Sequence, residues 1–175
     1  MEIGSRTTQI AEMMIARGMN HIAIDADKHV IMPPMKGLIF INKAVTGDRN
    51  QKTATFVKNK NPYKNHLTRI GFRYDGKLTG CLETVETTSI EEIMMELGIA
   101  QLDAIMMDCE GAETIILRRM KNTMAKQICV EFHVKQGQPQ SHVRMIQRCM
   151  RRAGYEERMQ WVDDGNMNYC LFVAN

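Results

Sequence analysis

The chain has 175 residues, of which 44% are hydrophobic and 25% charged, a composition that suits one globular domain and argues against disorder or a fibrous repeat. Its 23 Lys and Arg against 20 Asp and Glu leave a formal charge of +3, too small an excess to indicate a nucleic-acid or anionic membrane surface by itself. Five scattered cysteines without a Cys-x-x-Cys pair favour reduced thiols over a disulfide framework, and no segment has the pattern of a signal peptide or a membrane span. We therefore expect a soluble, cytoplasmic protein.

The first half of the chain alternates short apolar runs with one helical segment. Apolar residues spaced three and four positions apart predict a helix over Thr7–Ala16. The fragment ahead of it, Met1–Ser5, fits the last residues of a strand that enters the helix through a glycine turn. The strands expected next are His21–Ile24, Leu38–Ile41 with a continuation through Ala44-Val45, and Thr53–Val57.

Around residues 58–80 the composition of the chain changes. The segment Lys58–Lys64 is basic, rich in Asn and interrupted by Pro62, which predicts a mobile insertion within a single domain that spans residues 1–175. A basic run such as Lys58–His66 is more often a solvated loop than a binding site. The functional alternative is an electrostatic guide for an anionic acceptor, such as a phosphorylated sugar or an RNA end, and binding would then weaken steeply with salt.

The second half continues the alternation of helices and strands. Ser89 followed by Ile90-Glu91-Glu92 is typical of a capped helix start. The later elements expected are the strand Leu102–Met107, the helix Ala112–Met120, the strand Gln127–His133, the helix Gln140–Ala153, and a hairpin of Tyr155–Val162 with Asn168–Ala174. This order predicts an α/β fold: a Rossmann-like, doubly wound, mostly parallel sheet that ends in an antiparallel hairpin.

Acidic residues follow several of the predicted strands. They are Glu2, Asp25, Asp27, Asp108, Glu110 and Glu131. Any one of them is as easily a solvated strand end as a ligand contact, but in a doubly wound sheet these positions converge on one crevice, which favours a nucleoside-like ligand. The chain has neither a complete Gly-x-Gly-x-x-Gly turn nor a phosphate loop, so NAD and ATP are poor candidates. A nucleoside without a pyrophosphate fits better.

Three segments closely resemble motifs of the FkbM-type methyltransferases. Thr88–Glu92 resembles the helix start "T-hydrophobic-D/E-E" of that family, Leu102–Glu113 its strand ending in "D-hydrophobic-E-G-x-E", and Ile128–His133 its strand ending in "E-hydrophobic-H". Weaker similarity extends upstream to Glu2-Ile3-Gly4, Ile24–Asp27 and Asn42–Gly47, so that most of the chain is covered. The resemblance implies a class I, Rossmann-like methyltransferase that uses S-adenosylmethionine, commonly to methylate a hydroxyl of a sugar or small metabolite.

The resemblance also implies which residues bind the cofactor. They are Glu2, Gly4, Ser5, Asp25, Ala44, Val45, Asp108 and Glu110. Gly4 and Ser5 would approach the methionine moiety and Asp25 would hold the ribose. Val45 and Asp48 would border the adenine. Asp108 and Glu110 would face the methionine end or the substrate, and Glu131 and His133 would line the acceptor side.

A base is needed if the methyl acceptor is a neutral hydroxyl. His133 is the candidate, because Glu131 stands two residues earlier on the same side of the strand. Asp108 is the alternative base, so the predicted catalytic residues are His133, Asp108 and Glu131. These groups, with Glu110, could also hold a divalent cation. We predict no metal, because cofactor binding already accounts for the acids.

The chain departs from the family pattern at its first motif. The family has "D-x-G-A-N-x-G", whereas this turn reads Gly4-Ser5-Arg6-Thr7-Thr8 without the second glycine, and the chain is short at its N-terminus because it begins almost on the motif. Two function classes follow: an active methyltransferase with a small-molecule hydroxyl acceptor, or a non-catalytic binding or assembly protein with a degenerate cofactor site. The acids at four strand ends favour the enzyme, and neither nucleic acid nor a membrane is expected as its partner.

Overall fold

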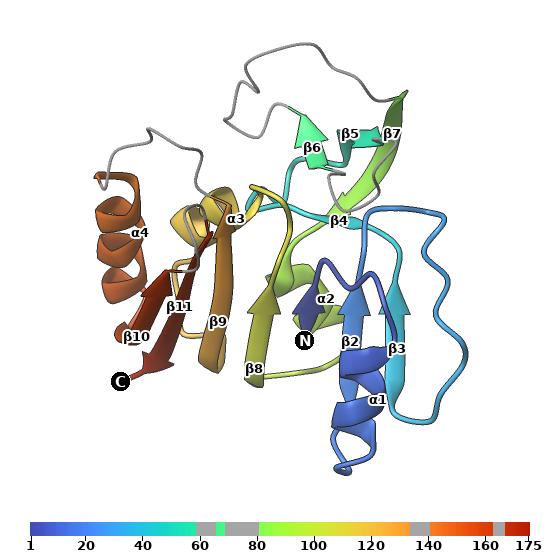
Figure 1. Ribbon diagram of the computed structural model, residues 1–175, viewed down its shortest axis with the longest axis horizontal. Helices are drawn as coiled ribbons and strands as arrows, with labels where there is room; N and C mark the ends of the chain where they lie inside the picture. The colour runs from blue at the N-terminus through green and yellow to red at the C-terminus, as the bar shows by residue number, and fades with distance from the viewer. Residues whose placement is uncertain (59–65, 69–80, 134–140, 163–166) are drawn as a thin grey trace.

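The computed structural model describes residues 1–58, 66–68, 81–133, 141–162 and 167–175. The strands of its central sheet are β1 (Glu2–Ile3), β2 (His21–Ile24), β3 (Leu38–Ile41), β8 (Leu102–Met107), β9 (Ala125–His133), β10 (Tyr155–Val162) and β11 (Met167–Ala174). They form a seven-stranded sheet in the order β10-β11-β9-β8-β1-β2-β3 (Figure 1). The pairs from β9 to β3 are parallel, and β11 is antiparallel to both β9 and β10. The predicted mostly parallel sheet with a C-terminal hairpin is confirmed.

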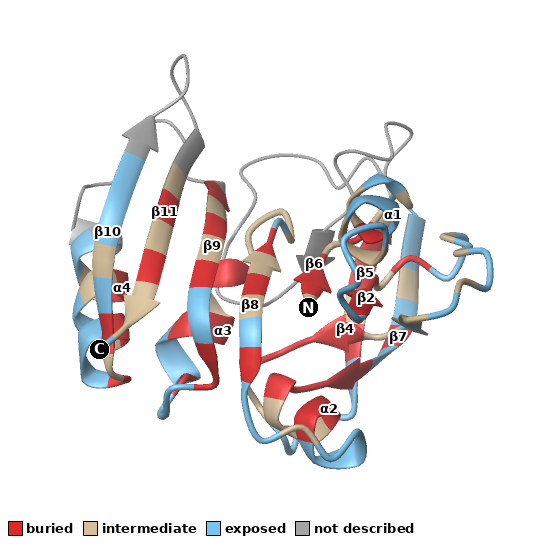
Figure 2. Ribbon diagram, turned by 90° about the horizontal axis from the view of Figure 1, so that it is seen from below, coloured by how far each residue is buried: buried red, intermediate tan, exposed pale blue. Residues whose placement is uncertain are grey.

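The helices of the described residues are α1 (Gln9–Ile15), α2 (Ile90–Glu96), α3 (Glu113–Arg119) and α4 (Ser141–Arg152). Ser89 begins α2 with the predicted capping box, in which its side chain accepts from the Glu92 N–H and the Glu92 side chain accepts from the Ser89 N–H. The helix α1 lies in front of β2 and β3 and α2 lies behind the sheet (Figure 1), and the view from below separates them in the same way (Figure 2). The doubly wound topology in its strict sense stays a prediction.

A second, smaller sheet lies beyond the carboxyl ends of the central strands (Figure 1). It consists of β4 (Ala44–Val45), β5 (Thr53–Lys58), β6 (His66–Thr68) and β7 (Cys81–Thr88), in the order β4-β7-β5-β6. The expected continuation of Leu38–Ile41 through Ala44-Val45 is therefore wrong. Two residues interrupt the run, and β4 pairs in parallel with β7, since Ala44 lies opposite Thr87 and Val45 opposite Thr88.

The predicted mobile insertion at 58–80 overlaps this smaller sheet. Three of its residues form β6, which pairs antiparallel with β5, so the insertion is in part ordered strand. The strand β7, which sequence analysis missed, pairs with β5 from Thr53 opposite Glu86 to Lys58 opposite Cys81. Residues 59–65 and 69–80 lie outside the described part of the chain, and the predicted mobility there stays a prediction.

The two sheets have separate apolar cores. The main core packs the strands of the central sheet against the helices, and Figure 2 colours the buried stretches of these elements red. Ile105, Ile128 and Val130 are fully buried in it. The smaller core contains Ala44, Ala54, Phe56 and Val85, and Ala26 packs against it from the loop after β2. The loops at the carboxyl ends of the central strands thus lie between two packed bodies, which is where a parallel sheet binds ligands.

Tyr155, at the start of β10, is a buried residue of the main core whose hydroxyl makes hydrogen bonds. Its side chain is fully buried, and its hydroxyl accepts from the backbone N–H groups of Met124 and Ala125 at 3.0 and 2.9 Å. Tyr155→Phe leaves both amides without that acceptor, so we expect the free energy of unfolding to fall by about 2–3 kcal/mol. Urea denaturation measures the change, and a loss below about 0.5 kcal/mol would mean that the amides find another acceptor.

Candidate functional site

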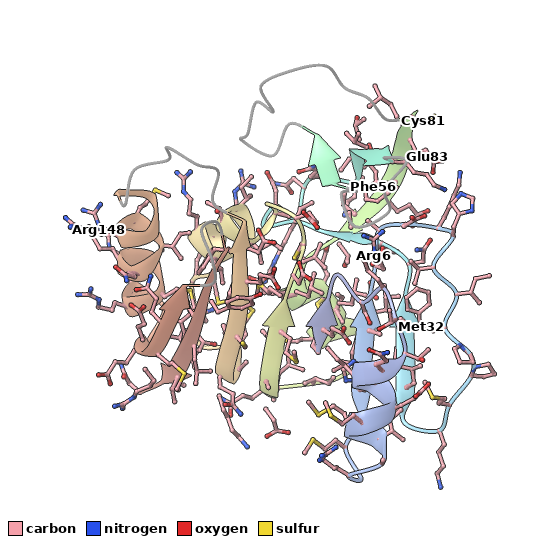
Figure 3. All side chains as sticks on the ribbon, in the orientation of Figure 1. Arg6, Met32, Phe56, Cys81, Glu83 and Arg148 are labelled. Atoms are coloured by element: carbon pink, nitrogen blue, oxygen red, sulfur yellow. The ribbon has the colours of Figure 1, made fainter. Side chains whose placement is uncertain are left out.

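A pocket opens between the carboxyl ends of the central strands and the smaller sheet. Its lining comes from the loops after β1, β2 and β8, from the segment that enters β4, and from β5. The lining residues are Ile3, Gly4, Arg6, Ile24, Asp25, Ala26, Lys43, Ala44, Val45, Phe56, Asp108, Cys109, Glu110 and Ala112. Figure 3 shows Arg6 above the strand ends and Phe56 beyond it in the smaller sheet. The pocket combines apolar walls with carboxylates at one edge, as small-molecule sites do.

Gly4 brings the loops after β1 and β8 into direct backbone contact. It has a φ of +91°, and a Cβ atom built on it would lie 1.8 Å from the carbonyl oxygen of Asp108. Its N–H donates to the Ile24 carbonyl at 2.9 Å, and the Asp108 N–H donates to the Ile3 carbonyl at 3.0 Å. Only glycine fits this position, because the left-handed backbone and the close approach both exclude a side chain.

The loop after β2 is held by a network of polar contacts. The Asp27 N–H donates to Oδ1 of Asp25 at 2.7 Å, and the His29 N–H donates to Oδ1 of Asp27 at 3.0 Å. From the end of β3, the side-chain amide of Asn42 donates to the carbonyl oxygens of Asp25 and Asp27 at 2.9 and 3.0 Å. These contacts fix the Asp25 carboxylate at the pocket before any ligand binds.

Two groups of the pocket have shifted pKa values. Burial raises the pKa of Asp25 to about 6, although the Asp27 N–H and the nearby Arg6 charge act in the opposite direction. Burial also raises the pKa of the Cys109 thiol well above its usual range, reinforced by the negative charges of Glu113 and Asp108. Cys109 is therefore a protonated thiol rather than a nucleophile at neutral pH.

Ion pairs connect the smaller sheet to the loops that border the pocket. Lys28 pairs with Glu83 at 3.1 Å and Lys43 pairs with Glu86 at 3.5 Å, both across to β7. Lys58 at the end of β5 lies 4.0 Å from the Asp27 carboxylate. These partly exposed pairs contribute little stability.

Most of the predicted cofactor-binding residues meet in this pocket. Gly4, Asp25, Ala44, Val45, Asp108 and Glu110 line it. Glu2 and Ser5 do not. The Glu2 carboxylate lies 2.9 Å from Nε2 of His21 on the neighbouring strand β2. Successive side chains of a strand point to opposite faces of the sheet, and the Glu2 side chain lies on the face that carries His21. Ser5 is fully buried, and its hydroxyl has no hydrogen-bond partner in the described part of the chain.

The predicted catalytic residues are not all brought together. Asp108 lines the pocket, whereas Glu131 lies on β9 outside its lining. His133 ends the same strand, opposite Met167 of β11, and its side chain lies outside the described part. The adenine role that the resemblance implies for Asp48 has no support in the lining, since the Asp48 carboxylate pairs with Arg119 at 2.7 Å.

Sequence reasoning missed several lining residues. Arg6 lies within the quoted turn Gly4–Thr8 and Lys43 within the quoted segment Asn42–Gly47, so their position beside Gly4-Ser5 and Ala44-Val45 was an available signal. Phe56 had no such signal, because it enters the pocket from a different sheet. Within the described ranges, no group of three or more His, Cys, Asp or Glu side chains is arranged to hold a metal ion.

A larger groove lies at the opposite end of the central strands. It is lined in part by Met1 and Met14 and by the first residues of β2 and β8, His21 and Leu102. None of the predicted site residues lines it. We take the smaller pocket as the candidate site, because parallel sheets bind ligands beyond the carboxyl ends of their strands.

The comparison with protein families identifies the domain that contains this pocket. The model of the methyltransferase FkbM domain matches residues 21–157, well over half of the chain. The chain belongs to the FkbM methyltransferase family. The FkbM match includes Asp25, Val45, Asp108 and Glu131 but begins after Gly4 and Ser5, so the first motif depends on the geometry alone.

The chain was also compared with curated proteins and with solved structures. No curated protein and no solved structure matches this chain. Among the described residues, no helix has the length and apolar character needed to cross a membrane.

Proposed function

We propose that this protein transfers a methyl group from S-adenosylmethionine to a hydroxyl of a small molecule, with a sugar or phosphosugar as the acceptor class. The observation that carries the proposal is the convergence of residues from four separate motifs on one pocket. Gly4, Asp25 and Asp108 each follow a different central strand and Val45 lies in β4, yet all four line the same space. Packing alone does not require acids at two of these positions.

The residues of the pocket fit the methyl donor. Ile3, Ile24 and Phe56 supply apolar surface suited to a purine. The carboxylates of Asp25 and Asp108 suit a ligand with ribose hydroxyls and cationic groups. Gly4 keeps the wall between them free of a side chain, so that backbone can approach the ligand. The donor set therefore matches a nucleoside that has no pyrophosphate.

In the proposed site each residue has one role. The Asp25 carboxylate accepts the ribose hydroxyls, and Ala44 and Val45 border the adenine. Gly4 approaches the methionine moiety, and Glu110 faces its ammonium group. S-adenosylmethionine, when bound, supplies an electrophilic methyl group on a sulfonium, and the protein contributes mainly alignment of the acceptor.

A neutral hydroxyl must lose its proton as it is methylated. Of the two predicted catalytic residues whose side chains the structure describes, Asp108 lines the pocket and Glu131 does not, so we assign proton acceptance to an oxygen of the Asp108 carboxylate. His133 and Glu131 at the end of β9 stay predictions for the acceptor side.

Calorimetric titration with S-adenosylhomocysteine and S-adenosylmethionine tests the proposal. We expect saturable binding to the wild type and at least a tenfold loss in Asp25→Asn, because the uncharged amide is a weaker acceptor than a carboxylate. Asp103→Asn is the matched control, since Asp103 is an exposed acid that pairs with Lys126 at the other end of β8 and outside the pocket. It should bind as the wild type does.

The outcome also decides between the two function classes. Absence of binding to a folded wild type would contradict the proposal. It would favour the non-catalytic, methyltransferase-fold alternative, which the missing second glycine of the first motif supports. If the donor binds, a screen of sugars and phosphosugars with labelled methyl donor identifies the acceptor.

A further inference from the structure

The loop between β8 and α3 carries two of the pocket acids in a strained backbone conformation. Asp108 and Glu110 both line the pocket from this loop. Glu110 has a φ of +52°, and Gly111 after it has a φ of +106°. A non-glycine residue in the left-handed region is sterically unfavourable, so the surrounding structure must hold the loop in this shape.

Glu113, the first residue of α3, makes the contacts that hold the loop. Its side chain is buried, with the residue 1% exposed. Oε1 accepts from the Cys109 N–H at 2.6 Å, and Oε2 accepts from the Gly111 N–H at 2.9 Å. One carboxylate thus bonds to the residues on both sides of Glu110. Hydrogen bonds to an ionised acceptor are stronger than neutral ones.

We infer that Glu113 is the positioning residue of the pocket: its buried carboxylate fixes the Cys109–Gly111 backbone so that Asp108 and Glu110 face the ligand. The identity of the ligand in this inference rests on the proposed function, whereas the contacts of Glu113 with the loop do not depend on it. Glu113 is absent from the pocket lining, so it acts through the loop. The start of the loop is held by the close contact between the Asp108 carbonyl group and Gly4. The hydrogen bonds of Glu113 hold the rest of the loop.

Hydrogen exchange followed by NMR tests the positioning without any ligand. In the wild type we expect the amides of Cys109 and Gly111 to exchange slowly, and Glu113→Gln should release at least one of them, because an amide side chain has a single acceptor oxygen. Glu92→Gln is the matched control, since Glu92 also accepts from a backbone N–H at a helix start, at 2.9 Å from Ser89, outside the pocket. Fast exchange of both amides in the wild type would overturn the inference.

Ligand binding tests the consequence. Glu113→Gln should weaken S-adenosylhomocysteine binding by about tenfold or more, whereas Glu92→Gln should leave it unchanged even where the two variants lose similar thermal stability. Gly111→Ala is a second variant: no atom lies within 4 Å of the added Cβ, so it strains the loop through its backbone alone. We expect it to weaken binding in the same direction.

The two possible failures are separable. If the wild type binds and Glu113→Gln binds equally well, the positioning role is wrong and the proposed function stands. If the wild type does not bind the donor or its product, the proposed function is wrong, and the exchange of the Cys109 and Gly111 amides still decides whether Glu113 holds the loop.

Discussion

Replacing Gly4 by alanine is expected to lower the free energy of unfolding by about 2–5 kcal/mol, the sum of a left-handed backbone penalty and an overpacking penalty. The added Cβ would lie 1.8 Å from the Asp108 oxygen and 2.8 Å from its carbonyl carbon. Both are backbone atoms of a neighbouring strand end, so no side-chain rotation relieves the clash. The loops after β1 and β8 must separate, and donor binding should be lost with them.

Gly18→Ala is the matched control for this prediction. Gly18 also has a positive φ, of +77°, but a Cβ built on it meets nothing within 4 Å. It should therefore lose only about 1 kcal/mol, from the backbone term alone. Urea denaturation of both variants measures the difference. Equal losses for the two would show that the Gly4 clash is relieved by a small shift and that the loop contact is not rigid.

Replacing Asp25 by asparagine is expected to stabilise the fold at pH 7.5 while it weakens donor binding. Burial raises the pKa of Asp25 from 3.8 to about 6, so the folded protein contains an ionised carboxylate at a cost of up to roughly 3 kcal/mol at neutral pH. Asparagine removes that cost and keeps an oxygen that can accept from the Asp27 N–H. We expect a gain of about 1–3 kcal/mol, a trade of stability for binding.

The pH dependence follows from the same shift. Because the folded-state pKa is the higher one, the stability from protonated Asp25 is fully present below pH 3.8 and is lost as the pH rises through about 6. The wild type should therefore lose stability relative to Asp25→Asn between about pH 4 and 6 and run parallel to it above. Donor affinity should change in the opposite direction and fall below pH 6, since the protonated carboxyl loses an acceptor.

Denaturation of the wild type and Asp25→Asn at pH 4, 6 and 7.5 measures both the gain and its pH window. Asp103→Asn again serves as the control, because the hydrogen bond and charge of Lys126 lower the pKa of this exposed acid. An Asp25→Asn variant that is no more stable than the wild type at pH 7.5 would contradict the burial argument.

Local patterns predicted most of the central sheet. The run His21–Ile24 is a strand with the expected bounds, and Ser89 caps α2 as its spacing with Glu92 indicates. Apolar periodicity and capping chemistry act over a few residues, so they can be read from the sequence. The same reasoning failed at Ala44-Val45, because whether an apolar pair continues its strand depends on which distant strand it meets.

The candidate site also has residues that the sequence places correctly and residues that it does not. The position of Asp25 and Asp108 directly after buried strands predicts that they meet, because parallel strands end at one edge of the sheet. Glu2 also lies on a central strand, but its side chain faces His21 rather than the pocket. The face on which a residue lies in a two-residue strand depends on its pairing register, which the sequence pattern of so short a strand does not specify.

The sequence by itself determined the α/β class, the order of the central elements and the family motifs, since each depends on residue types at short spacing. Three features were decided only by the tertiary structure. The strand β4 pairs with β7 in the smaller sheet rather than extending β3, Phe56 of that sheet forms a wall of the pocket, and Gly4 contacts Asp108. The pairing of β4 with β7 and the contact of Gly4 with Asp108 each join residues more than forty positions apart in the chain. Their partners are selected by the packing of two sheets against each other, and no local pattern in the sequence encodes that choice.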